Sequence, residues 1–207
     1  MKNPVFGATD IITILGKRGS GKTTLSRKVQ QVYPRLVIFD RLHEYATEKS
    51  EGFAEVTTFG GFANALTWSL DKTRFKIIYR FNIEADSHDE EFNQAMRILY
   101  YRGSVCAVVD EVWNFANAHY LPKWLKEMAL TGRHRGCSLI TTSQRPAEVH
   151  KTLLSQSHHV FCGQLHEKND IKYLSEVIGS DAEKLPSLPQ FKFLHYRPGF
   201  QTSVVSN

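Results

Sequence analysis

Gly16-Lys17-Arg18-Gly19-Ser20-Gly21-Lys22-Thr23 is the stretch of this chain that decides its fold. It matches G-x-x-x-x-G-K-[ST], in which the glycines let the backbone curl so that its N–H groups point at phosphate oxygens. The apolar run at residues 11–15 before it is typical of a buried strand, and Leu25, Val29 and Val32 after it are spaced like one helix face. Strand, glycine loop and helix in this order predict a phosphate-binding loop, strengthened by the positive end of the helix dipole.

The loop supplies a set of candidate nucleotide-binding residues. Lys22 is expected to reach the outer phosphates, and the Thr23 hydroxyl is expected to bind Mg²⁺. The predicted nucleotide-binding residues are Gly16, Lys17, Arg18, Gly19, Ser20, Gly21, Lys22, Thr23 and Thr24.

The composition is ordinary for a soluble globular protein. The 207 residues are 42% hydrophobic and 23% charged, enough for one α/β domain, so residues 1–207 are predicted to form a single P-loop domain. No apolar run approaches the ~20 residues that cross a bilayer, and residues 1–7 have no apolar core of signal-peptide length. We therefore expect no transmembrane segment, and a location in the cytoplasm or inside a particle assembled there.

Cysteine, histidine and charge patterns exclude some classes of site. Cys106, Cys137 and Cys162 have no C-x-x-C spacing, which favours buried small hydrophobes over a disulfide framework or a zinc site. His158 and His159 are adjacent and would point to opposite faces of a strand, a poor arrangement for one metal. The net charge of +5 permits a polyanionic partner without requiring one.

Apolar β-rich runs alternate with segments of helical period along the chain. Further strands are predicted at residues 36–39, 75–79, 105–109, 139–142 and 160–162, and a terminal hairpin at residues 191–196 and 201–205. Helices are predicted at residues 62–70, 92–100, 121–128 and 171–178, and from Pro146 toward Leu154, while residues 87–91 form an acidic loop or helix start. This alternation predicts a mostly parallel sheet with helices on both faces and ligands at the carboxyl ends of the strands.

The run at residues 105–109 ends in Asp110-Glu111. An apolar strand that ends in an acid is the usual Mg²⁺-side partner of a phosphate-binding loop, so Asp110 is predicted to hold the metal. Glu111 would place a second carboxylate where it can polarise a water for attack on the γ-phosphate, as in ATP hydrolysis. The alternative is that Glu111 only caps the next helix.

Gln144 follows the predicted strand at residues 139–142. If this strand neighbours the one that ends at Asp110, the Gln144 amide can hydrogen-bond the γ-phosphate or the attacking water, since it carries both a donor and an acceptor. The alternative is an ordinary loop residue.

Arg133 and Arg135 lie in a glycine-bracketed turn that enters this same strand. The turn is therefore at the opposite end of the sheet from the phosphates of its own chain. Either arginine is expected to neutralise charge in the transition state at a neighbouring subunit, which predicts an oligomer. The alternative is a solvated basic turn.

Asp40 and Glu44 follow the predicted strand at residues 36–39, near the same sheet edge. Two interpretations stay open for them, a role around the metal or in coupling, and a hydrogen-bonded turn.

Taken together, these motifs resemble the FtsK–HerA superfamily of DNA-pumping ATPases, over roughly residues 10–161. The matching segments are Gly16–Thr23, Asp40-x-x-x-Glu44-Tyr45, Val108–Glu111, Gly132–Gly136 and Thr142–Pro146. Size and the run at residues 131–146 are most similar to the genome-packaging ATPases of membrane-containing icosahedral viruses, in particular those of Sulfolobus turreted icosahedral viruses.

This resemblance implies a RecA-like P-loop NTPase fold of the ASCE type, a hexameric ring, Mg²⁺-dependent ATP hydrolysis and translocation of double-stranded DNA into a preformed capsid. ATP rather than GTP follows from the resemblance alone, as do capsid or inner-membrane protein partners and a place in the host cytoplasm or the virion. The implied site residues are Glu111 as the water-activating base, Lys22 on the nucleotide, Thr23 and Asp110 on Mg²⁺, Gln144 as the sensor, and Arg133 or Arg135 as the arginine finger, with Arg135 favoured.

Three other functions compete with this one. A small-molecule kinase also has one phosphate-binding loop and arginine-bearing lids, but Glu111 would favour wasteful hydrolysis. A nucleotide-gated binding protein has no need of Glu111, and an ATPase that moves a protein cargo stays open. The candidate DNA contacts are Lys123, Lys126, Arg145 and Lys151, although basic surface side chains are usually just solvated. The sequence assigns no adenine pocket, ring size or direction of travel.

Overall fold

A computed structural model describes residues 5–46, 52–82 and 88–207 of the chain. In these ranges the strands are β1 Ile11–Leu15, β2 Arg35–Asp40, β3 Phe53–Val56, β4 Phe75–Arg80, β5 Cys106–Val109, β6 Ser138–Ser143, β7 His159–Cys162, β8 Lys192–Tyr196 and β9 Ser203–Ser206. The helices are α1 Lys22–Gln30, α2 Phe59–Trp68, α3 Asp89–Arg102, α4 Lys123–Thr131, α5 Lys151–Ser155 and α6 Lys168–Ile178. Four 3₁₀ segments are η1 Val112–Asn114, η2 Gly132–Arg135, η3 Pro146–Glu148 and η4 Gly179–Ser187.

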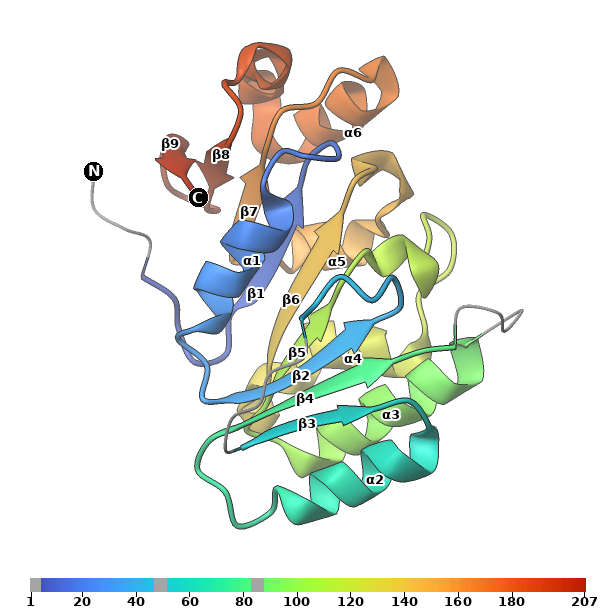
Figure 1. Cartoon of the computed structure of the whole chain (residues 1–207). Coiled ribbons are helices and arrows are strands. Elements are labelled where there is room, and N and C mark those ends of the chain that lie inside the picture. Colours follow the sequence, from blue (N-terminus) through green and yellow to red (C-terminus); the bar gives the residue numbers. More distant parts are fainter. Residues whose placement is uncertain (1–4, 47–51, 83–87) are drawn as a thin grey trace.

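The strands form one sheet in the order β3-β4-β2-β5-β6-β1-β7-β8-β9 (Figure 1). Strands β1 to β7 all pair in parallel, while β8 and β9 add an antiparallel hairpin at one edge. The mostly parallel sheet and the C-terminal hairpin are therefore confirmed. Strand β6 lies between β1 and β5, as in an ASCE-type P-loop sheet, so the carboxyl ends of these three strands meet at one edge.

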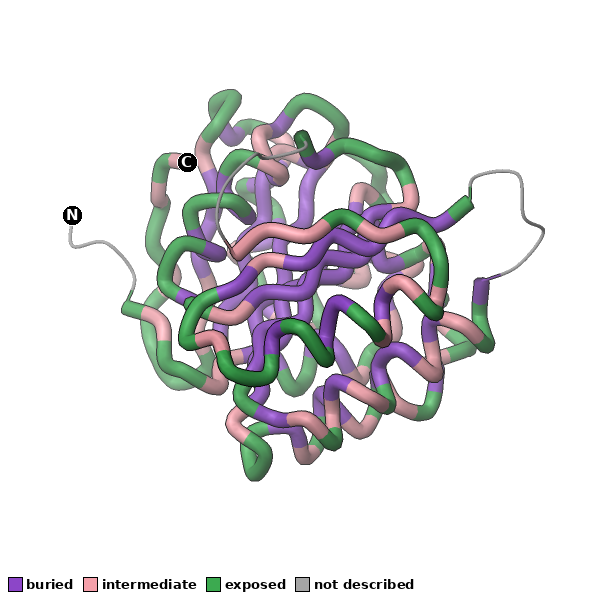
Figure 2. Tube along the Cα trace, turned by 60° about the horizontal axis from the view of Figure 1, so that its bottom comes forward, coloured by how far each residue is buried: buried purple, intermediate pink, exposed green. Residues whose placement is uncertain are grey.

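Helices cover both faces of the sheet, as the sequence predicted. Helices α2, α3, α4 and α5 lie on one face and α1 on the other (Figure 1). Successive side chains of a strand point to opposite faces, so Val37 and Phe39 join the larger core and Ile38 joins the core under α1, together with Ile12 and Ile14. The central strands are buried along most of their length (Figure 2), as near-continuous apolar runs in a parallel sheet predict.

Several boundaries differ from the sequence prediction for identifiable reasons. The edge strand β3 was not predicted, because it has only four residues and is half-exposed with no strict alternation. Val32 is exposed beyond the end of α1. The helix predicted from Pro146 is split into η3 and α5, because the Ala147 N–H donates to Asp170 Oδ1 on α6 and the His150 ring caps a new helix at Thr152 N.

Of the acidic segment predicted at residues 87–91, residues 89–91 form the first turn of α3. Ser87 lies outside the described residues. Cys106, Cys137 and Cys162 are all buried and free, which confirms their interpretation as small core residues.

A buried histidine pair ties the C-terminal hairpin to the parallel sheet. The His159 Nδ1 and His195 Nε2 atoms are 2.9 Å apart, and His159 Nε2 lies 3.1 Å from Asp10 Oδ2. Burial, followed by the nearby His159 and Arg197, lowers the pKa of His195 from 6.5 to about 4. Burial also lowers the pKa of His159. The pair therefore stays neutral in the folded chain under conditions where an unfolded chain would protonate both rings.

We expect His195→Phe to flatten the acid side of the stability profile. The unfolded chain binds a proton at this position near pH 6.5 and the folded chain only near pH 4, so wild-type stability is lost as the pH falls through this window. The loss from this group is about 1.4 kcal/mol per pH unit. The Phe ring keeps the stacking on Phe161, where the centroids are 4.3 Å apart. Urea unfolding at a series of pH values measures the slope.

His134→Phe is the matched control, because His134 is exposed. Its slope between about pH 4 and 6.5 should equal that of the wild type. An equal slope for His195→Phe would contradict the interpretation of the buried pair.

Candidate nucleotide site

The glycine loop between β1 and α1 closes tightly on itself. Gly21 precedes α1 with φ of +95°, a conformation that favours glycine. A Cβ on Gly16 would lie 2.8 Å from Ser20 Oγ, so this position has no room for a side chain. The Ser20 hydroxyl is buried and has no hydrogen-bond partner within the described residues. A tight loop at a helix N-terminus with an orphaned hydroxyl fits the phosphates of a nucleotide.

Lys22 lies between the glycine loop and the acidic end of β5. Its side chain is 7% exposed, and its Nζ donates to the Lys17 carbonyl at 3.4 Å. The same Nζ lies 3.6 Å from Glu111 Oε1. Burial lowers the pKa of Lys22, and Glu111 opposes this shift. The buried ammonium group of Lys22 therefore lies beside a carboxylate, with which the phosphates of a bound nucleotide would compete.

The two acids that follow β5 are tied to the neighbouring strand β6. Thr142 Oγ1 donates to Asp110 Oδ1 at 2.7 Å and accepts from the Glu111 N–H at 2.8 Å. Glu111 has φ of +47°, in the left-handed region that is costly for a residue with a side chain. Strained residues of this kind cluster at functional sites, and here the strain turns the second acid toward the loop.

Each carboxylate oxygen of Glu111 has a defined neighbour. Oε2 accepts from Trp113 Nε1 at 2.9 Å and from the Gln144 N–H at 3.1 Å, while Oε1 faces Lys22. The side chain makes no capping hydrogen bond to the following turn η1. The structure therefore disagrees with the alternative that Glu111 is only a helix cap.

The oxygen atoms near Thr23 suit a hard cation. Burial, followed by Glu111, Glu44 and Asp40, raises the pKa of Asp110 to about 7, although the Thr142 hydrogen bond opposes the shift. Thr23 Oγ1 donates to Glu44 Oε2 at 3.4 Å. Hydroxyl and carboxylate oxygens are the ligands that Mg²⁺ prefers, and a bound cation would offset the crowding of carboxylates. Thr23 and Asp110 therefore fit the predicted metal site, with Glu44 beside them.

Asp40 and Glu44 have different positions. Asp40 is fully buried and accepts from the Glu44 and Tyr45 N–H groups at 3.0 and 3.1 Å. Its Oδ2 also lies 2.7 Å from Arg80 Nη1. Asp40 thus forms the hydrogen-bonded turn that was one of the two interpretations, and the turn carries Glu44 to Thr23.

Gln144 lies at the same edge, because β5 and β6 are neighbours in parallel register. Its backbone N–H contacts Glu111 directly, and the residue is half-buried. The condition under which Gln144 was predicted to approach the phosphates is therefore met.

The arginine turn lies at the opposite, amino edge of the sheet, as expected from the sequence. Both Arg133 and Arg135 are exposed there, on η2 before β6. The Arg135 guanidinium is 5.4 Å from the ring centroids of both Tyr100 and Tyr101. Arg133 lines a separate hollow of about 340 Å³ that Arg197 also lines. The structure does not bring either arginine to the glycine loop of its own chain.

Other predicted residues are more peripheral. Lys17 Nζ lies 3.3 Å from His166 Nε2, and Arg18 and Thr24 are exposed. Among the candidate DNA contacts, Lys123 lies over the Trp124 ring, Arg145 pairs with Glu148, and Lys151 pairs with Glu176.

Sequence reasoning missed two supports of the loop from the far end of the chain. Gln190 Nε2 donates to the Gly19 carbonyl at 3.3 Å, and Asn207 Nδ2 donates to the Gly21 carbonyl at 3.2 Å. It also missed the contacts of Trp113 and Thr142 with the acids. Gln190 and Asn207 belong to no motif, and they reach the loop only because distant segments meet. Trp113 lies two residues after Glu111, but no pattern indicates where its indole N–H points. Thr142 lies in a motif segment, but its two hydrogen bonds depend on the pairing of β6 with β5.

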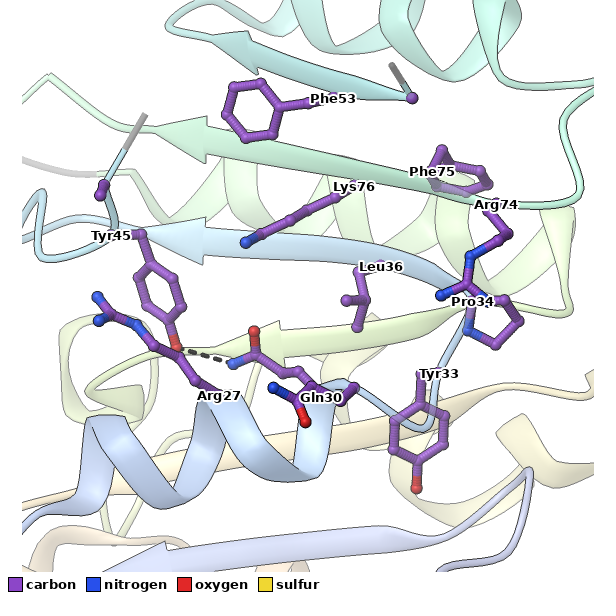
Figure 3. Close-up of a pocket in the computed structure, with 13 residues that line it drawn as sticks. Arg27, Gln30, Tyr33, Pro34, Leu36, Tyr45, Phe53, Arg74, Phe75 and Lys76 are labelled. Carbon is purple, nitrogen blue, oxygen red and sulfur yellow. Dashed lines mark hydrogen bonds between the residues drawn. The ribbon is translucent and has the colours of Figure 1, made fainter. Parts of the chain in front are cut away.

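A hollow of about 500 Å³ lies away from the glycine loop (Figure 3). It is lined by the second half of α1 and by Leu36 and Phe75, which lie near the amino ends of β2 and β4. The dashed line in Figure 3 marks Gln30 Nε2 donating to Tyr45 Oη at 3.0 Å. This hollow is at the other end of α1 from Lys22, so it is separate from the predicted phosphate site.

Comparisons with known proteins were made for the whole chain. No family model matches it. The probable helicase MJECL08 of Methanocaldococcus jannaschii is 27% identical over 157 residues, which are 73% of this chain and 26% of the helicase. This chain thus spans about a quarter of the length of that relative. Protein P9 of Pseudoalteromonas phage PM2 is 22% identical over 184 residues, which are 84% of this chain and 78% of P9.

A solved structure matches nearly the whole fold. The genome packaging NTPase B204 of Sulfolobus turreted icosahedral virus 2, in complex with AMPPCP, has a TM-score of 0.75 and 19% identity to this chain. The match covers 96% of this chain and 97% of B204. The chain therefore has the fold of this NTPase, and the predicted P-loop fold and the resemblance to B204 are confirmed at the level of the fold. None of the helices in the described ranges is long and apolar enough to cross a membrane.

We expect Asp110→Asn to stabilise the nucleotide-free chain at high pH relative to the wild type. The raised pKa of about 7 means that the folded state holds this proton more tightly than an unfolded chain with a pKa of 3.8. Below about pH 4 this group makes its full contribution to the free energy of unfolding of the wild type. That contribution is lost by about 1.4 kcal/mol per pH unit as the pH rises from there through 7. Denaturant unfolding in EDTA at about pH 5 and 8 measures the difference.

Asp71→Asn is the control, since Asp71 is an exposed residue. Its stability relative to the wild type should be the same at both pH values. A difference for Asp110→Asn that is independent of pH would contradict the assigned titration.

Proposed function

We propose that this chain is a Mg²⁺-dependent ATPase that translocates double-stranded DNA and packages a viral genome into a preformed capsid. The observation that carries the proposal is the 3.6 Å distance between Glu111 Oε1 and Lys22 Nζ, with Asp110 alongside. This contact supports the proposal, because it brings an acid that could activate water, and the acid before it that could bind a metal, beside the lysine of the glycine loop.

Each residue of the site has a defined part in hydrolysis. Lys22 moves from Glu111 to the outer phosphates, and the loop N–H groups of residues 16–23 hold the rest of the phosphate chain. Glu111 Oε1 is then free to accept a hydrogen bond from the attacking water and orient it toward the γ-phosphate. The Gln144 amide, at the same edge, detects whether this phosphate is present.

The metal site follows from the same edge. Thr23 Oγ1 and Asp110 would hold Mg²⁺, and Mg²⁺, when bound, supplies positive charge to the β- and γ-phosphates. Asp110 stays oriented because Thr142 Oγ1 donates to its Oδ1 at 2.7 Å. A carboxylate positioned to activate water supports hydrolysis over transfer to a small-molecule acceptor, because a phosphotransferase has to protect the phosphate from water.

DNA as the cargo is supported by the proteins that this chain resembles. Their names are those of a genome packaging NTPase and a probable helicase. We propose a homohexameric ring of single P-loop domains, each spanning residues 1–207, in the host cytoplasm or in the virion. Its partners would be double-stranded DNA and capsid or inner-membrane proteins, and Arg133 or Arg135 would complete the nucleotide site of the next subunit.

The proposal is tested by ATP hydrolysis of the purified chain with and without duplex DNA, over a range of protein concentrations. Wild type should hydrolyse ATP in the presence of Mg²⁺, faster with duplex DNA and at concentrations that favour assembly. Glu111→Gln should bind ATP but hydrolyse it at least ~100-fold more slowly, since a general base typically contributes that much. Near-normal turnover of Glu111→Gln would remove Glu111 from its proposed role.

Lys22→Ala separates nucleotide binding from hydrolysis, because it should lose nucleotide affinity, whereas Glu111→Gln should keep it.

Stimulation of hydrolysis by DNA should weaken steeply as the salt concentration rises, since contacts with DNA phosphates release counterions. Turnover that requires a nucleoside or a small acid would favour a kinase, and turnover indifferent to duplex DNA would contradict DNA as the cargo.

The shared site predicts complementation between two inactive variants. Arg135→Ala keeps its own loop but lacks the arginine for its neighbour, and Lys22→Ala lacks its own nucleotide but keeps the arginine. Each alone should be slower than wild type, by on the order of 10³-fold for the loss of an arginine finger. Mixed before assembly, the two should regain part of the activity.

Arg133→Ala in the same mixture decides between the two arginines of the turn. The finger is the arginine whose alanine variant is inactive alone and is rescued by Lys22→Ala. Full activity of Arg133→Ala and Arg135→Ala alone, or inactivity without rescue for both, would contradict catalysis shared between subunits.

A further inference from the structure

Trp113 contacts the proposed base and belongs to none of the motifs. It lies on η1, two residues after Glu111, and its indole Nε1 donates to Glu111 Oε2 at 2.9 Å. The side chain is 43% exposed, so the ring is not held there by burial in the core. Packing alone does not explain why a large aromatic side chain lies half in solvent with its N–H directed at the Glu111 carboxylate.

The hydrogen bonds divide the two oxygens of Glu111 between two tasks. Oε2 receives two N–H donors, one from Trp113 and one from the Gln144 backbone at 3.1 Å. Oε1 receives neither of these donors and lies 3.6 Å from Lys22 Nζ. Donors that converge on one oxygen fix the rotation of the carboxylate group, so the other oxygen points consistently toward the lysine.

The two donors are not equally adjustable. The Gln144 N–H follows β6, whose parallel pairing with β5 fixes its position. The Trp113 indole reaches Glu111 from the 3₁₀ segment η1, and it is the side-chain donor of the pair. Without it, one backbone N–H would have to hold a carboxylate whose own backbone is already in a strained conformation at φ of +47°.

We propose that Trp113 is a positioning residue that holds Glu111 Oε2, so that Oε1 is the oxygen offered to the attacking water. This inference rests on the proposed function of Glu111 in ATP hydrolysis. When Lys22 leaves Glu111 for the phosphates, the indole hydrogen bond keeps the carboxylate from turning, and the freed Oε1 remains aimed into the site. Trp113 acts through Glu111 and does not contact the phosphates.

The decisive experiment is a double-mutant cycle on steady-state ATP hydrolysis, with Trp113→Phe, Glu111→Gln and the double variant. Trp113→Phe keeps the aromatic ring and removes the N–H, so it should lower kcat about 10-fold, in the range of a lost hydrogen bond to a charged group. The KM for ATP should stay within about twofold, because binding is left to the glycine loop. In the Glu111→Gln background, Trp113→Phe should have no further effect on kcat.

Intrinsic fluorescence provides a readout that does not depend on turnover. The exposed indole hydrogen-bonded to Glu111 should change its emission when ATP displaces Lys22 from that carboxylate. Trp68→Phe is the matched control, because Trp68 is similarly exposed at 41% and lies on α2 against Lys72. The emission change should persist in Trp68→Phe and vanish in Trp113→Phe, and Trp68→Phe should keep wild-type kcat.

Each outcome separates the inference from the function on which it rests. If Glu111→Gln is slow while Trp113→Phe keeps wild-type kcat, the positioning role is overturned and the base survives. A Trp113→Phe defect that adds in full to that of Glu111→Gln also overturns it, because the effect would then be a general structural one. If Glu111→Gln hydrolyses ATP normally, the proposed function of Glu111 itself fails. If Trp113→Phe folds poorly, Trp113→Leu, which keeps an apolar side chain and has no hydrogen-bond donor, should give the same loss of kcat.

Discussion

The approach of Lys22 to Glu111 is the contact on which the rest of the site depends, because it joins the glycine loop after β1 to the acids after β5. Both side chains are almost fully buried, and a buried ion pair gains little net stability once its desolvation is counted. Burial also lowers the lysine pKa against the pull of Glu111. We infer that the pair is kept for what replaces it, since phosphates entering the loop offer the same ammonium group a more highly charged partner.

The order of the strands makes that contact available. Strand β6 separates β1 from β5, so the loop and the acids face each other across the end of one intervening strand. That strand supplies Thr142, which holds the Asp110 side chain and the Glu111 backbone with one hydroxyl. A shift of β6 by one residue would turn this hydroxyl to the other face of the sheet, so the parallel register is part of the chemistry.

The sequence predicted the parts of the site that are local and left out those that are assembled. The glycine loop and the two acids after β5 could be predicted because each directly follows an apolar run. The carboxyl ends of parallel strands share an edge, so the two segments were expected to lie close together. The contacts of Thr142 with the acids follow from the register of β6 on β5, and the support from Gln190 follows from chain folding over 171 positions to Gly19. Trp113 is close to Glu111 in the chain, but no pattern indicates that its indole N–H is directed at the carboxylate. Strand β3 was missed because four half-exposed edge residues show no clear period.

The acids of the proposed site and the candidate finger arginines lie at opposite edges of the sheet, and this bears on the proposed assembly. The carboxyl edge gathers Asp110, Glu111 and Glu44 around Lys22, enough negative charge for burial and neighbouring acids to raise the pKa of Asp110 to about 7. The amino edge presents the exposed Arg133 and Arg135. A contact between the carboxyl edge of one copy and the amino edge of the next is heterologous, and heterologous contacts close into rings when the rotation allows. In the ring that we propose, Arg133 and Arg135, which lie away from the glycine loop of their own chain, would be supplied to the nucleotide of the next copy.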